Sequence, residues 1–85
     1  MPVTSAQIRM ARAALNWTVR DLAEEAGLHR NTISNIETGR YVGDSTTIKA
    51  MEAVFRRAGV EFIDENGGGP GVRLRKQGVR KIVKS

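Results

Sequence analysis

Apolar residues recur with helical spacing close to the N-terminus. One face of this segment carries three of them, Ile8, Ala11 and Leu15. Their spacing is that of an amphipathic helix. Thr4 and Gln7 stand three residues apart, which is the spacing of a capping box. The pattern predicts a helix over residues 4–16.

A second short helix is predicted directly after the first. Thr18 can cap its N-terminus, and Asp21 places a negative charge near the positive end of the helix dipole. We expect this helix to run to about Ala26 and to end at Gly27, because glycine readily adopts the left-handed conformation found at helix ends.

A third helix is expected after the turn formed by residues 27–29. The segment 30–38 makes about two helical turns, with Ile33 and Ile36 on one side and Gly39 as the stop signal. The side chains opposite the two isoleucines are polar, so this helix is predicted to pack one face and expose the other.

The fourth helix is predicted to begin at Asp44 or Ser45 and to continue through Ala58, where Gly59 ends it. Its apolar face consists of Ile48, Met51, Val54 and Phe55. We expect the four apolar faces to share one compact core.

The hydrophobic period changes from helix to strand after Gly59. Residues 60–63 are rich in apolar side chains, residues 72–75 alternate apolar and basic, and residues 64–71 between them have turn composition. The Gly-Gly-Gly-Pro-Gly stretch in this turn lacks the Lys-Ser or Lys-Thr pair of a phosphate-binding loop. A β-hairpin is therefore predicted.

The predicted fold class is mainly α. Residues 4–58 form a four-helix domain, residues 59–76 a C-terminal β-hairpin, and residues 77–85 a flexible basic tail. A chain of 85 residues has room for one domain and buries only about 60% of its unfolded surface. A second copy would therefore add useful stability.

The composition argues against an enzyme. The chain has no cysteine, which excludes a disulfide framework and a thiolate zinc site. His29 is the only histidine, and neither a cluster of histidine ligands for a metal nor a Ser/His/Asp relay can be assembled around it. We expect no cofactor and no metal. With neither an apolar run long enough to span a membrane nor a signal peptide at the N-terminus, we expect a soluble, cytoplasmic protein.

Positive charge gathers at the C-terminal end. The net charge is +5 and the isoelectric point about 10.5, which fits a polyanionic partner. Residues 1–58 carry eight basic against six acidic side chains, residues 59–70 carry only three acids, and residues 71–85 carry six bases and no acid. Such a tail suits non-specific nucleic-acid packaging as well as sequence-specific binding.

Two short helices joined by a three-residue turn place demands on residue size. A small side chain is needed where the helices approach each other, and Ala23 stands there; Gly27 supplies the left-handed turn residue. The remaining core-facing positions of this unit are Leu22, Ala26, Leu28, Ile33 and Ile36. A chance match at all of these positions is improbable.

The stretch TVRDLAEEAGLHRNTISNIETG resembles the helix-turn-helix of the lambda-repressor and Cro-like (Xre) family of bacterial and phage regulators. The resemblance covers roughly residues 4–58 and implies a four-helix lambda-repressor-like DNA-binding domain, cytoplasmic and nucleoid-associated. In this family the second helix of the motif enters the major groove. It would here be the helix from Arg30 to Glu37.

The resemblance implies which side chains contact bases: Arg30, Asn31, Ser34 and Asn35, with His29 at the start of the helix. With 100° per residue, these helix residues and Thr38 fall within an arc of about 140°, opposite the two isoleucines. Arginine can bind guanine and asparagine can bind adenine in the major groove. The same residue types also occur on ordinary solvated helix faces, so it is the flanking motif that favours base contact.

Phosphate contacts are expected at both ends of the motif. The hydroxyl of Thr18 and the free N–H groups of the helix it caps could hold a phosphate, although a cap alone explains Thr18 equally well. The family often has Gln where this chain has Val19, which puts one backbone contact in doubt. Arg40 and Tyr41 lie in the loop that runs along the DNA backbone in relatives.

Two other features are interpreted as structural. The resemblance implies an ion pair between Arg12 and Glu37 that ties the first helix to the third and neutralises a carboxylate that would otherwise repel phosphate. Trp17, between the first two helices, is interpreted as a packing residue rather than a platform for base stacking.

The chain departs from the family after residue 58. Relatives commonly close the domain with a fifth helix that forms the dimer interface, whereas strands are predicted here. We expect the hairpin to pair two copies across a two-fold axis and so to cover its exposed edges. The dimerisation residues would be Val60, Phe62, Ile63, Val72 and Leu74.

The sequence thus favours a sequence-specific regulator of transcription that binds double-stranded DNA as a homodimer on a palindromic operator. An alternative from another class is the antitoxin of a toxin–antitoxin pair, which would bind a partner protein through residues 71–85 and regulate its own operon. Co-purification of a small partner protein distinguishes the two.

Overall fold

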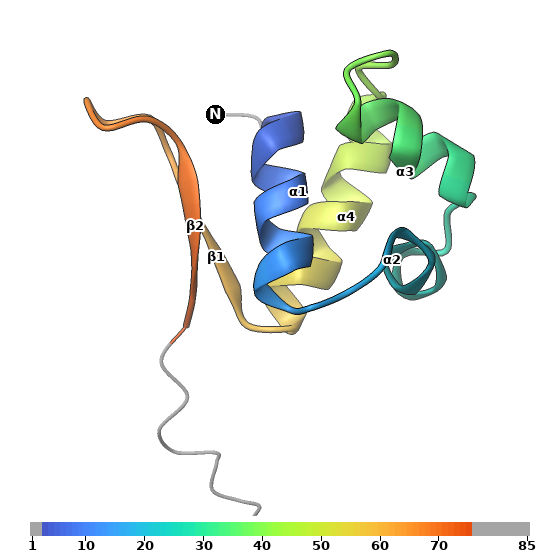
Figure 1. Ribbon diagram of the computed structural model, residues 1–85, viewed down its shortest axis with the longest axis horizontal. Coiled ribbons are helices and arrows are strands. Elements are labelled where there is room, and N and C mark those ends of the chain that lie inside the picture. Colours follow the sequence, from blue (N-terminus) through green and yellow to red (C-terminus); the bar gives the residue numbers. More distant parts are fainter. Residues whose placement is uncertain (1–2, 76–85) are drawn as a thin grey trace, which may run out of the picture.

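The computed structural model describes residues 3–75, so the predicted basic tail lies outside the described residues. The elements are α1 (Ser5–Ala14), α2 (Val19–Ala26), α3 (Arg30–Glu37), α4 (Ser45–Arg57), β1 (Val60–Ile63) and β2 (Gly71–Leu74). The mainly α class and the order of four helices before a hairpin agree with the sequence prediction. Figure 1 shows that α1 and α4 stand between the hairpin on one side and α3 on the other.

The helices begin where their capping residues indicate. Thr4 and Thr18 each form a complete capping box, with Gln7 and with Asp21. The carboxylate of Asp44 accepts the backbone N–H of Thr47 at 2.7 Å and so caps α4. Each of these caps satisfies backbone donors that the first helical turn leaves without partners.

One hydrophobic core joins the four helices and β1. Its buried members are Ile8, Ala11, Leu22, Ala23, Ile33, Ile36, Met51, Val54, Phe55 and Val60. Phe55 is the largest of the fully buried side chains and packs between two other aromatic rings. The ring of Trp17 stacks on it at 5.9 Å, and the ring of Phe62 meets it edge-on at 6.0 Å. Trp17 is therefore a packing residue, as predicted.

The hairpin is antiparallel and pairs Val60 with Leu74 and Ile63 with Gly71. The second strand begins at Gly71 rather than at Val72, one residue earlier than the alternating pattern indicated, because glycine has no side chain to contribute to that pattern. One face of the hairpin packs on α1 and α4 (Figure 1).

Gln7 connects α1 to both strands of the hairpin. Its side chain is 2% exposed. The oxygen accepts the backbone N–H of Thr4 at 3.0 Å, while Nε2 donates to the carbonyl oxygens of Ile63 at 3.0 Å and Gly71 at 2.9 Å. The sequence predicted only the capping role of Gln7.

This geometry predicts that Gln7→Glu destabilises the protein by about 2–3 kcal/mol, because two buried carbonyls lose their donor and face a negative charge. The loss is measured as the free energy of unfolding in urea. It should shrink at acidic pH, where a protonated glutamate can donate one hydrogen bond.

The matched control for this prediction is Thr4→Ala, which removes the cap of α1 but leaves the bonds to the hairpin and should cost only about 1 kcal/mol. If Gln7→Glu is no more destabilising than Thr4→Ala at neutral pH, the bonds from Gln7 to the hairpin contribute nothing.

Candidate nucleic-acid interface

The outer face of α3 is polar and exposed. Arg30, Asn31, Ser34 and Asn35 are all exposed. Among the hydrogen bonds of the described residues, none uses the side chain of any of these four. On the opposite side Ile33 is 0% and Ile36 is 3% exposed. The helix thus presents one row of donors and acceptors while its other face is fixed in the core.

The turn between α2 and α3 has the predicted geometry. Gly27 ends α2 in the left-handed conformation with φ 68°, and its neighbourhood has room for a Cβ. The requirement for glycine here is therefore conformational rather than steric. The N–H of Leu28 donates back to the carbonyl of Ala23 at 3.0 Å, and Ala23 is 8% exposed where the helices meet.

His29 is the N-cap of α3. Its Nδ1 accepts the backbone N–H of Asn31 at 3.0 Å. A neutral imidazole that accepts at Nδ1 carries its proton on Nε2, so the exposed side chain presents an N–H donor beside the polar face of α3. The sequence placed His29 in the turn but did not assign this cap, because histidine is not among the usual capping residues.

Thr38 is the C-cap of α3, at the opposite end of the helix from His29. Its hydroxyl donates to the carbonyl of Ser34 at 2.9 Å. The backbone N–H groups of Arg40 and Tyr41 both donate to the carbonyl of Asn35, at 2.9 and 3.1 Å. The exposed side chains of Arg40 and Tyr41 are therefore carried on a loop whose backbone is tied to α3.

Thr18 and Asp21 occupy the N-terminal end of α2. The Thr18 hydroxyl accepts the N–H of Asp21 at 3.0 Å, and the Asp21 carboxylate accepts the N–H of Thr18 at 2.9 Å. Both residues are exposed. The next two backbone N–H groups, of Val19 and Arg20, belong to the first turn, where a helix supplies no acceptor. They are the donors that remain for an anion.

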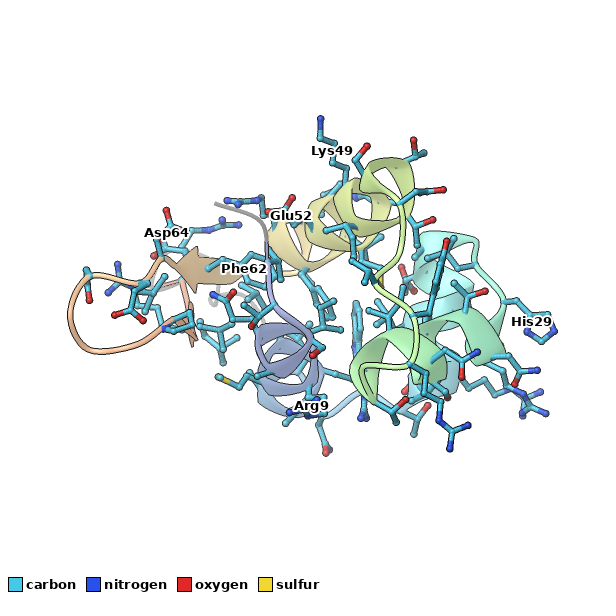
Figure 2. All side chains as sticks on the ribbon, turned by 90° about the horizontal axis from the view of Figure 1, so that it is seen from above. Arg9, His29, Lys49, Glu52, Phe62 and Asp64 are labelled. Atoms are coloured by element: carbon cyan, nitrogen blue, oxygen red, sulfur yellow. The ribbon has the colours of Figure 1, made fainter. Side chains whose placement is uncertain are left out.

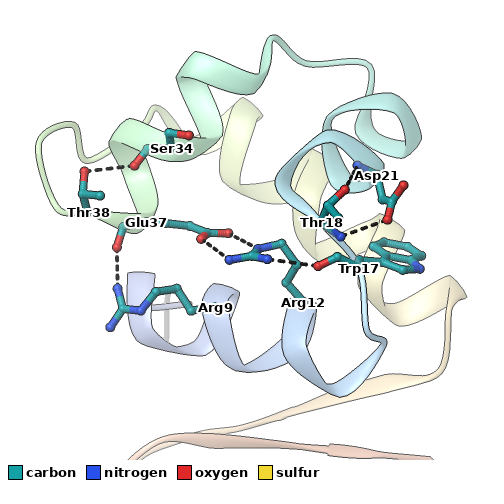
Figure 3. A network of polar contacts seen from close by, with 8 residues as sticks. All are labelled: Arg9, Arg12, Trp17, Thr18, Asp21, Ser34, Glu37 and Thr38. Carbon is teal, nitrogen blue, oxygen red and sulfur yellow. Dashed lines mark hydrogen bonds and ion pairs between the residues drawn. The ribbon is translucent and has the colours of Figure 1, made fainter.

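A network of charged groups joins α1 to α3 (Figure 3). Arg12 and Glu37 form the ion pair that the resemblance implied, with two parallel bonds: Nε to Oε2 and Nη2 to Oε1, each 2.9 Å long. A third donor of Arg12, Nη1, reaches the carbonyl of Trp17 at 3.0 Å. The Arg12 side chain is 24% and the Glu37 side chain 6% exposed.

The carboxylate of Glu37 also acts on the ionisation of its partner. Its hydrogen bonds and negative charge raise the pKa of the Arg12 guanidinium, although burial of Arg12 opposes part of this shift. The Arg12 guanidinium therefore stays positively charged and neutralises the nearly buried carboxylate.

Arg9 holds the same end of α3. Its guanidinium donates to the backbone carbonyl of Glu37, one of the carbonyls that a helix leaves unpaired at its C-terminus. A positive charge at this end of a helix is favourable. Sequence reasoning missed Arg9, although it precedes Arg12 by one helical turn and so lies on the same side of α1.

The predicted dimerisation residues have different environments in the hairpin. Val60 is completely buried in the core of its own chain, and Phe62 and Val72 pack partly against that core. Ile63 is half-buried, and Leu74 is 52% exposed. A contact between copies through the hairpin would therefore use Leu74 and the strand edges rather than Val60.

The residues 3–75 contain no group of three or more His, Asp or Glu side chains placed to hold a metal ion. Within the same part of the chain, no helix has the length and apolar character needed to cross a membrane.

Comparison with known proteins supports the resemblance. A family model described as Helix-turn-helix matches residues 8–62, well over half of the chain. The match begins within α1 and ends in β1, so it includes all of α2, α3 and the turn between them. A comparison with curated proteins finds no match.

The buried pair predicts that Arg12→Ala lowers the free energy of unfolding by about 3 kcal/mol, because Glu37 is left without its counter-charge in a nearly water-free position. Equilibrium unfolding in urea measures the loss. Arg12→Lys should lose less, because a point charge remains but the two parallel bonds do not.

Arg20→Ala is the matched control, since Arg20 and Glu24 form an exposed pair at 3.7 Å with side chains 75% and 69% exposed. Removing that pair should change stability by less than about 1 kcal/mol. Equal effects of Arg12→Ala and Arg20→Ala would contradict a structural role for the buried pair.

Proposed function

The chain belongs to the lambda-repressor and Cro-like (Xre) family of DNA-binding helix-turn-helix regulators, and from this premise we propose that it binds a specific double-stranded sequence by inserting α3 into the major groove. The observation that carries this proposal is the face of α3. Its four polar side chains are exposed and make no hydrogen bonds to the rest of the described chain, while the buried isoleucines fix their position.

The chemistry of this recognition face suits base edges. Arg30 can donate two bonds to O6 and N7 of guanine, and Asn31 and Asn35 can each donate to N7 and accept from N6 of adenine. Ser34 lies between them and can donate or accept. His29 contributes the Nε2–H donor at the edge of the face. We propose these five residues as the base contacts.

Phosphates on either side would hold α3 in register. At one end the free N–H groups of Val19 and Arg20, next to Thr18, point out from the positive end of α2. At the other end Arg40 and Tyr41 extend from the loop after α3. Contacts of this kind orient a protein on the duplex without selecting a sequence.

We propose that the regulator acts as a homodimer on a palindromic operator. A single α3 contacts only a few base pairs, and two copies related by a two-fold axis can place their recognition helices in successive major grooves, about 34 to 36 Å apart. Two copies also double the number of phosphate contacts.

A second candidate function is that of an antitoxin that regulates its own operon. The observation that favours it is the position of the hairpin, which lies on the side of the molecule away from α3 (Figure 1). A partner protein could bind the hairpin while α3 occupies DNA. Isolation of the protein from its host together with a small partner encoded beside it would support this function, and isolation without one would oppose it.

The proposed base contacts predict that Asn31→Ala weakens binding to the operator by about 1–3 kcal/mol and leaves binding to random DNA nearly unchanged. The operator is first identified by selection from random duplexes, and affinities are then measured by fluorescence anisotropy. Asn66→Ala, an exposed change in the hairpin loop, is the matched control and should alter neither affinity. Equal losses on both kinds of DNA would indicate non-specific packaging instead.

The proposed phosphate contact predicts a different pattern for Arg40→Ala. Affinity should fall by a similar factor on operator and random DNA, and the slope of log affinity against log salt should decrease by about one, because one fewer counterion is released. Arg73→Ala removes an exposed positive charge on the hairpin, where Arg73 pairs with Glu61, and should leave the slope unchanged. A slope that Arg40→Ala does not alter would rule out the contact.

A further inference from the structure

The loop between α3 and α4 carries the most exposed large apolar side chain of the described residues. Val42 is 86% exposed, and the neighbouring Tyr41 is 45% exposed. The loop is held in place at Gly43, which has φ 80° and packs so closely that a Cβ would lie 3.0 Å from Cδ1 of Ile36 and 3.2 Å from Cδ1 of Ile48. Val42 is therefore exposed even though the backbone of its loop is packed in place.

A groove lies beside this side chain. A cavity of about 450 Å³ is bounded by Val3, Val42 and Ile48, and its rim carries Asp44, Lys49 and Glu52. A second hollow of about 290 Å³ shares the same three apolar walls and continues toward Ile8 and Ile36. Val42 projects beside a groove that it helps to line, so one surface offers both an apolar side chain and an apolar recess.

The rim of the groove carries both signs of charge. Lys49 and Glu52 lie on the same side of α4 (Figure 2). The hydrogen bond from the N–H of Thr47 lowers the pKa of the Asp44 carboxyl, so this acid contributes a negative charge to the rim. The rim carries one lysine and two acids, and one of these acids, Glu52, also pairs with Arg56 of α4 at 3.3 Å. A surface with both signs of charge can face a rotated copy of itself, as the interface of a two-fold dimer must.

The position of the groove also fits the spacing of DNA sites. One copy is 40 Å long, and the hairpin and α3 lie toward opposite ends of that axis (Figure 1). Copies joined end to end through their hairpins would hold their α3 helices farther apart than the 34 to 36 Å between successive major grooves. The loop with Val42 follows α3 directly, so a two-fold axis beside it keeps the two recognition helices close.

We infer that the Val42 groove is the surface through which a second copy of this chain docks, with Val42 of each copy inserted in the groove of the other and Lys49 facing the acidic rim of its partner. This rests on the proposed homodimer and names its interface. It differs from the hairpin interface predicted from the sequence, because it uses exposed apolar surface next to α3.

Sedimentation equilibrium of the full chain without DNA tests the inference. Val42→Glu should raise the dissociation constant of the dimer by about 100-fold or more, since a charge replaces a buried valine. Leu74→Glu is the matched control: it places the same charge on an exposed apolar position of the hairpin and should leave the dimer intact. Thermal melting establishes that both variants are folded.

A charge exchange adds a test specific for the two-fold arrangement. Lys49→Glu should weaken the dimer by about tenfold, because the rim of each copy then carries three acids and no lysine, and the two rims repel each other. Adding Glu52→Lys restores opposite charges across the axis and should recover most of the affinity. A double variant as weak as the single one would contradict the pairing.

The remaining outcomes overturn the inference. A Val42→Glu protein that dimerises as tightly as the parent would exclude this surface, and dissociation by Leu74→Glu alone would assign the interface to the hairpin. A parent chain that stays monomeric at several hundred micromolar would also refute it. Binding of that monomer to a half-operator, measured separately, would still support the proposed DNA contacts of α3.

Discussion

The carboxylate of Glu37 sets the constraint on which the placement of the recognition helix depends. It is nearly buried at the C-terminal end of α3, where the helix dipole is already negative. A charge in such a position is tolerated only beside a fixed counter-charge. Arg12 supplies it through two bonds, and Arg9 binds the adjacent carbonyl. These two guanidinium groups hold the C-terminal end of α3 against α1, beside the apolar contacts of the core.

The opposite side of α1 is held just as firmly, which makes this helix the link between the two ends of the molecule. Gln7 binds a carbonyl of each hairpin strand, and the apolar residues of α1 enter the core between them. The hairpin packs against this side of α1 and against α4. The aromatic contacts of Phe55 with Trp17 and Phe62 fill the space where these elements meet.

Local signals explain why most of the fold could be predicted. The caps Thr4, Thr18 and Asp44 act within one turn of their own helices, so their meaning can be taken from neighbouring residues. The hydrogen bonds of Gln7 with the hairpin could not be predicted, because they join residues 56 and 64 positions apart. The same distinction applies to the candidate site. The exposed face of α3 could be predicted from helical periodicity, whereas the Arg9 contact could not, because it depends on how α1 packs against α3. The recess beside Val42 likewise forms from three segments that meet only in the folded chain.

The independence of the recognition face from the rest of the chain has a consequence for evolution. Because Asn31, Ser34 and Asn35 form no side-chain hydrogen bonds with other described residues, substitutions there leave the core and the caps as they are. Descendants of a duplicated gene could therefore acquire new operators by changing these positions alone. His29 is the exception, because its ring also caps α3, so lineages that replace it are expected to do so mainly with serine, threonine, asparagine or aspartate, which preserve the cap.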